Sequence, residues 1–170
     1  MFKKNLSSCL CRAMAIGSIL ALATSCGQVF SGTYKELNSG LTTTYRNIKP
    51  DATLMVMNDV VIRHSDIPLG EKFTIINQGV QGLAIRDGKF SAGCSLVISD
   101  ANDRILLNHP DLFAGNDVWD DVPDKQLKCT IFTGSPMKWD EEYFATVTFW
   151  DKYGDGVLTN KVKVRMMDIP

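Results

Sequence analysis

The chain has few residues suited to catalysis or metal binding. Only two of its 170 residues are histidines, His64 and His109, and they do not form a paired ligand spacing. A zinc site needs several nitrogen or sulfur ligands, so histidine gives no sign of one. The Gly-x-Ser-x-Gly pattern of serine hydrolases is also absent. We therefore expect no cofactor and a non-catalytic protein.

An excess of basic residues is also missing. The chain has 18 basic and 19 acidic residues. Three of the basic residues and none of the acidic ones lie in the first 25 positions, so the remainder carries a net charge of −4. Nucleic-acid binding depends on a basic patch that neutralises phosphates. The composition argues against a nucleic-acid partner.

No apolar run is long enough to cross a bilayer. The N-terminal run, Ala13 to Ala23, covers 11 residues, whereas a spanning helix needs about 20. Lys3 and Lys4 precede this run and small residues follow it, which is the order of a secretion signal. Cleavage would remove it, and no segment of the mature chain would span the membrane.

The end of this segment resembles the lipobox of a bacterial lipoprotein signal peptide. The matching residues are Leu22-Ala23-Thr24-Ser25-Cys26. The resemblance implies a signal peptide over residues 1–25 and acyl chains on Cys26, which would anchor the protein to a membrane. Cleavage without lipidation is the alternative.

Helical patterning is absent after residue 53, and short alternating runs take its place. Residues face alternately in and out over 125–132, 143–150 and 161–166, as in an antiparallel sheet with one buried face. Seven or eight such strands with frequent turns predict an all-β fold, an antiparallel β-sandwich of immunoglobulin-like architecture over residues 54–170. A closed barrel is the alternative. Residues 26–53 are polar and predict a tether, with a first edge strand near its end.

Two cysteines remain after removal of the signal and acylation of Cys26. Cys94 and Cys129 both lie in alternating apolar runs, so we expect both to face the core. Outside the cytoplasm such a pair can oxidise to a disulfide. A disulfide and two buried free thiols both remain open.

The segment 109–124 is rich in aspartate. Its carboxylates could bind Ca²⁺ at one end of the sandwich, although aspartates are also common in solvated turns. Together with His109 they are the residues on which an envelope hydrolase would depend. The candidate metal ligands are Asp111, Asp117, Asp120 and Asp121.

Asp151 to Gly156 differs from a calcium loop. Tyr153 and Val162 occupy positions that need an oxygen ligand. We predict a hairpin turn here, in which Gly154 and Gly156 adopt positive φ.

Four aromatic residues are candidates for a ligand or partner surface. Loop tryptophans can stack on sugar rings or anchor a protein partner. On the strand at 143–150, two aromatics lie on the face opposite the expected core, exposed if that face is solvated. The four residues are Trp119, Trp139, Phe144 and Trp150.

The chain resembles the small lipoproteins of Bacteroides and related bacteria. The residues that carry the resemblance are Thr24-Ser25-Cys26-Gly27, Gly134-Ser135-Pro136-Met137-Lys138, Tyr143 and Phe149-Trp150-Asp151-Lys152-Tyr153-Gly154. It implies a cell-envelope location at the outer membrane, and the lack of acidic residues directly after Cys26 favours the periplasmic face.

Some members of the wider group that the chain resembles bind glycans or build surface fibres. We therefore expect a lipid-anchored binding or assembly module, with a glycan or an envelope protein as partner. The alternatives are the envelope hydrolase and a structural subunit of a surface fibre.

Overall fold

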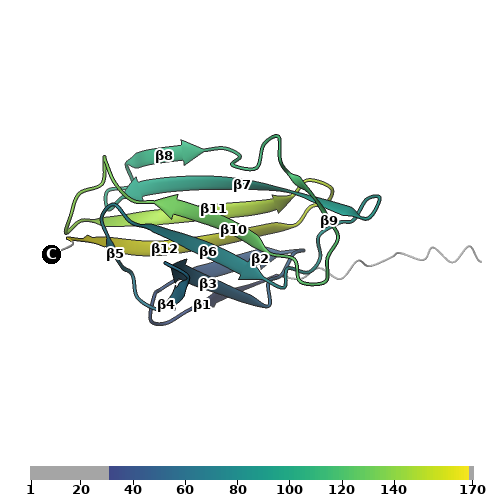
Figure 1. Cartoon of the computed structure of the whole chain (residues 1–170), viewed down its shortest axis with the longest axis horizontal. Coiled ribbons are helices and arrows are strands. Elements are labelled where there is room, and N and C mark those ends of the chain that lie inside the picture. Colours follow the sequence, from purple (N-terminus) through teal and green to yellow (C-terminus); the bar gives the residue numbers. More distant parts are fainter. Residues whose placement is uncertain (1–30, 169–170) are drawn as a thin grey trace, which may run out of the picture.

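The computed structural model describes residues 31–168, and these form two antiparallel sheets packed face to face (Figure 1). The predicted β-sandwich is confirmed, and the closed-barrel alternative is wrong because the two sheets are separate. The expected signal peptide and Cys26 lie outside the described residues. Within 31–168 there is no helix with the length and hydropathy needed to span a membrane.

The larger sheet has eight strands. Six follow the order β1-β2-β12-β11-β7-β8, while β5 pairs with β12 and β9 pairs with β7. Their bounds are β1 Ser31–Lys35, β2 Thr42–Arg46, β5 Asp66–Pro68, β7 Lys89–Asp100, β8 Ile105–His109, β9 Val118–Asp120, β11 Glu142–Asp151 and β12 Val157–Met167.

The smaller sheet has four strands in the order β10-β6-β3-β4. Their bounds are β3 Ala52–Met57, β4 Val60–Ile62, β6 Lys72–Gln78 and β10 Leu127–Phe132. Strand β10 is an edge strand, because within the described part of the chain it pairs with β6 alone.

Alternation along the long strands produces the core between the sheets. In β11 every second residue is buried, from Tyr143 to Asp151, and β10 buries Leu127, Cys129 and Ile131 in the same way. Burial of a large apolar side chain stabilises the fold by roughly 1.5–3 kcal/mol. The two inward faces therefore supply the main stabilising contacts.

The sandwich begins earlier than the sequence predicted. Residues 31–53 of the expected tether form β1, β2 and the start of β3, and the described residues 31–168 contain twelve strands rather than seven or eight. Leu41, Thr43 and Ile48 are at most 1% exposed. Their polar neighbours obscured the pattern because β1 and the outer face of β2 are largely exposed.

A buried polar network joins the two sheets. Asn160 of β12 donates from Nδ2 to Oδ1 of Asn77 on β6 at 3.2 Å, and Thr53 also donates to that oxygen at 2.9 Å. Asn77 donates in turn to the carbonyl of Leu127, and Thr43 donates to Asn160. Since both asparagines are fully buried, these hydrogen bonds satisfy polar groups that water cannot reach.

One edge of β7 is lined by three successive segments. Strand β8 pairs with its C-terminal half, the amide of Leu112 donates to the carbonyl of Cys94, and β9 pairs with residues 89–91. The chain then crosses to the other sheet through residues 121–126 and enters β10. This crossing leaves an opening between the sheets beside β9.

Candidate functional site

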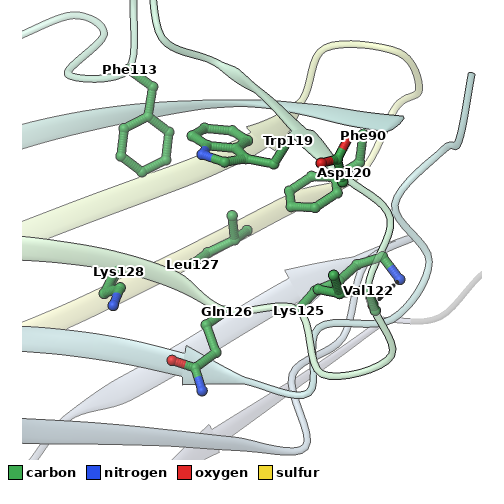
Figure 2. Close-up of a pocket in the computed structure, with 9 residues that line it drawn as sticks. All are labelled: Phe90, Phe113, Trp119, Asp120, Val122, Lys125, Gln126, Leu127 and Lys128. Atoms are coloured by element: carbon green, nitrogen blue, oxygen red, sulfur yellow. Dashed lines mark hydrogen bonds between the residues drawn. The ribbon is translucent and has the colours of Figure 1, made fainter. Parts of the chain in front are cut away.

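The opening beside β9 is an aromatic cleft of about 470 Å³. Figure 2 shows its side chains, which come from β7, the 110–117 loop, β9, the crossing segment and β10. We call it the β9 cleft. Its lining residues are Phe90, Phe113, Trp119, Asp120, Val122, Lys125, Gln126, Leu127 and Lys128. The volume is within the range typical of small-molecule sites.

Three aromatic rings form one wall of the cleft. Phe90 and Trp119 stack with ring centroids 5.5 Å apart and an interplanar angle of 28°. Phe113 meets Trp119 edge to face at 5.3 Å, and it also lies 6.0 Å from the fully buried Phe149. The wall is therefore continuous with the core.

Strand pairing places Trp119 in this wall. It lies opposite Phe90 in the β7–β9 register, and the amide of Asp121 donates to the carbonyl of Gly88 at 2.8 Å. Trp119 is half-buried, between exposed Val118 and Asp120. The Trp119 side chain of this short strand therefore faces the cleft, while the residues on either side of it are exposed.

A lysine and two aspartates fix the loop that carries Phe113. Nζ of Lys152 lies 2.6 Å from Oδ2 of Asp111 and 2.6 Å from Oδ2 of Asp117. The other oxygen of Asp111 accepts from the amides of Cys94 and Phe113. The loop is thus joined both to β7 and to the turn after β11.

Protonation follows from these contacts. Burial alone would raise the pKa of Asp111, but the hydrogen bonds from Lys152 and the two amides outweigh it and lower that pKa. Hydrogen bonds to Asp111 and Asp117 raise the pKa of Lys152. Asp111 and Lys152 are therefore charged at neutral pH, and the ammonium lies between the carboxylates of Asp111 and Asp117.

The four candidate metal ligands are thus engaged by lysines. Asp111 and Asp117 share Lys152, Asp120 pairs with Lys89 at 3.3 Å, and Asp121 pairs with Lys125 at 2.6 Å. Residues 31–168 contain no cluster of three or more potential metal ligands. The structure brings two of the four together, but around an ammonium.

The rim of the cleft carries one lysine without an anionic partner. Lys125 is held by Asp121 and by the carbonyl of Val122. Lys128 is exposed on β10, and its side chain makes no ion pair or hydrogen bond within the described residues. Its ammonium is therefore available to a ligand.

The four candidate aromatics do not share one surface. Trp119 lies in the β9 cleft, whereas Trp139 is 65% exposed in the loop between β10 and β11. Phe144 and Trp150 lie on the outer face of β11, where Lys161 Nζ is 5.0 Å from the Phe144 ring centroid and Trp150 packs against Gly93. Of the four, Trp119 is the one that lines the β9 cleft.

The two core cysteines are free thiols and both are buried. Cys94 comes from the larger sheet and Cys129 from the smaller one. A side-chain hydrogen bond with Cys129, together with burial, raises the pKa of Cys94. The two thiols are neighbours across the core but are not bridged in this structure.

The remaining sequence candidates lie apart from the cleft. His109 is exposed at the end of β8, and no hydrogen bond or ion pair within residues 31–168 joins it to an aspartate of the 109–124 segment. The segment 151–156 is a turn between β11 and β12, as expected, but Gly154 and Gly156 are not at positive φ. They are needed for space, because a Cβ would collide with Asp151 and Ile48 respectively.

Most of the cleft was not predictable from the candidate residues. Phe90, Phe113 and Lys128 were not singled out, because each lies in a different segment and none has a motif. No sequence signal links Phe90 to Trp119, because the β7–β9 pairing that aligns them joins strands that are far apart in the chain.

Comparisons with known proteins assign no family. No family model matches the chain, and no curated protein matches it. One similar solved structure is described as "X-ray structure of Northeast Structural Genomics Consortium target SoR45". It has 12% sequence identity and a TM-score of 0.27, covering 82% of this chain and 84% of that chain. A likeness at this level supports no inference about function.

Proposed function

We propose that the protein is a non-catalytic binding module of the bacterial cell envelope, which takes a small ligand in the β9 cleft. The observation that supports this most is the open aromatic wall. Trp119 is only half-buried although it stacks on Phe90 and meets Phe113. Aromatic side chains with one accessible side contribute large contact area at low entropic cost.

The anchoring part of the proposal rests on the N-terminal sequence. Acyl chains on Cys26 would hold the sandwich at the outer membrane, with the periplasmic face favoured. Metabolic labelling with an alkyne-bearing fatty acid tests this, because Cys26→Ala should abolish labelling. Labelling that persists in Cys26→Ala would exclude this anchor.

A binding screen tests the ligand-binding part. The purified protein is titrated with a library of small apolar, amphipathic and saccharide compounds, and binding is measured by calorimetry. Binding in the cleft should be lost in Trp119→Ala and retained in Trp139→Ala, which removes an exposed loop tryptophan from outside the cleft. If Trp119→Ala affects no ligand, the cleft is not the binding site.

A second candidate is assembly by strand exchange, favoured by β1. Among residues 31–168 this edge strand pairs only with β2, and four of its five residues are exposed. A weakly packed edge strand is the element that subunits can exchange. Native mass spectrometry at increasing protein concentration tests this, since only monomers at high concentration would count against it.

A further inference from the structure

We propose that the natural ligand of the β9 cleft is a small amphipathic carboxylate. Its apolar body would lie against Trp119 and Leu127, and its carboxylate would pair with Lys128. This inference rests on the proposed binding function and adds the chemical class of the ligand.

The inner part of the cleft favours an apolar body. Phe90 and Leu127 are 4% and 2% exposed, so the innermost walls are continuous with the hydrophobic core. Phe113 and Val122 add apolar surface from the loops on either side. A ligand that buries hydrocarbon here gains the free energy of removing both surfaces from water.

The aromatic wall does not favour a sugar ring. Trp119 is stacked by Phe90 at 28° and abutted by Phe113 at 75°. Stacking on a sugar needs a broad free aromatic face, and these two neighbours occupy much of the indole surface. An apolar group inserted beside the indole suits this geometry better.

The charges at the rim favour a carboxylate. Asp120 and Asp121 are paired with Lys89 and Lys125. Asp124 does not line the cleft and accepts a hydrogen bond from the Gly79 amide. Lys128 is therefore the charged lining residue without a partner in the described part of the chain. A carboxylate there would form a charge-assisted hydrogen bond.

The indole of Trp119 is a second donor among the lining residues of the cleft. The indole N–H of Trp119 has no hydrogen-bond acceptor among residues 31–168, and Figure 2 shows its nitrogen on the edge facing Leu127 and Lys128. Indole nitrogens donate only. Lys128 and Trp119 each offer a donor to a ligand, and a carboxylate can accept from either; the side-chain amide of Gln126, which also lines the cleft, can donate as well.

The test compares acids with matched neutral compounds. Indole-3-acetate is paired with indole-3-acetamide, and decanoate with decanol, so that the two pairs separate a flat aromatic body from a linear acyl chain. Binding to the purified protein is measured by calorimetry. At least one acid should bind about tenfold more tightly than its neutral partner, as expected for a charge-assisted hydrogen bond.

Lys128→Met should remove this preference by weakening the binding of the acid. Since Lys128 is exposed, the change keeps the fold intact, which thermal unfolding verifies. The matched control is Lys72→Met. Lys72 is an exposed lysine of the neighbouring strand β6, and it lies opposite Phe132 at the other end of β10. It should retain the preference.

The outcomes separate the two proposals. If acids and neutral compounds bind equally, or if Lys128→Met retains the preference, the carboxylate inference is overturned while the binding function stands. If neither acid binds, the inference is also overturned. The binding function itself fails only if no compound in the wider screen shows binding that depends on Trp119.

Discussion

Replacement of Asn77 by leucine should destabilise the sandwich strongly. Leucine has a similar shape but cannot hydrogen-bond, and Asn77 makes three buried hydrogen bonds, with Thr53, Asn160 and the carbonyl of Leu127. A buried hydrogen bond contributes about 1 kcal/mol net. The expected loss is therefore about 3 kcal/mol of unfolding free energy, a large share of the 5–15 kcal/mol typical of a domain.

The assay is urea unfolding followed by tryptophan fluorescence. The matched control is Thr74→Val on the same strand, which removes an exposed hydroxyl bonded to Thr130. A surface change of this kind should cost about 0.5 kcal/mol or less. Both variants replace one polar side chain of β6 by an apolar one, and they differ in whether the lost hydrogen bonds are buried.

A double-mutant cycle makes the prediction stricter. Asn160→Leu alone should also be costly, but Asn77→Leu with Asn160→Leu removes both members of the pair and should cost about 0.5–3 kcal/mol less than the sum. Additive costs, or a loss below about 1 kcal/mol for Asn77→Leu, would refute the idea that this network joins the sheets.

Three further predictions concern other parts of the structure. Asp111→Asn keeps the oxygen that caps two amides but removes the charge facing Lys152. Because the pKa of Asp111 is lowered in the fold, its stabilisation is present above its unfolded pKa of about 3.9 and is lost as pH falls through the lower folded value. The variant should be less stable at pH 7 in urea unfolding, and the difference should shrink by pH 3; an unchanged difference would contradict this. Gly93→Ala should lower the free energy of unfolding by about 1–3 kcal/mol, because the added methyl group collides with the Trp150 ring. Added to Trp150→Ala, the same change should cause no further loss, as thermal unfolding would report. The two core thiols should resist alkylation in the folded protein and react in denaturant, as peptide mass spectrometry would show; rapid alkylation of the native protein would contradict their burial.

The long strands could be predicted because their burial alternates without interruption. Tyr143 to Asp151 of β11 and Leu158 to Met166 of β12 show period two through their whole length. Such a pattern specifies which residues enter the core, since a shift of one position would expose all of them. The sandwich class therefore followed from the sequence alone.

The short strands could not be predicted in this way. Strands β4, β5 and β9 have three residues each, too few for alternation to be distinguished from a turn. In β1, four of the five residues are exposed, so no buried face marks the strand. These elements form because partner strands are already in place, which is a tertiary effect.

The β9 cleft depends on the same tertiary effect. Trp119 was a candidate because of its residue type, but its neighbours Phe90 and Lys128 became part of a site only when β9 paired with β7 and the chain crossed to β10. Alternation along a strand specifies which of its side chains are buried and which are exposed. It carries no information about which strand edges pair.

The acidic segment illustrates the converse. Its aspartates predicted a cation, and the cation found between two of them is Lys152, which lies 41 residues from Asp111 in the chain. A carboxylate pair attracts whichever positive charge the fold brings near, and an ammonium on the chain is always present at high local concentration. Because this pair also fixes Phe113 beside Trp119, the acidic segment supports the aromatic wall. The residues that suggested chemistry therefore position the binding site and do not perform catalysis in our proposal.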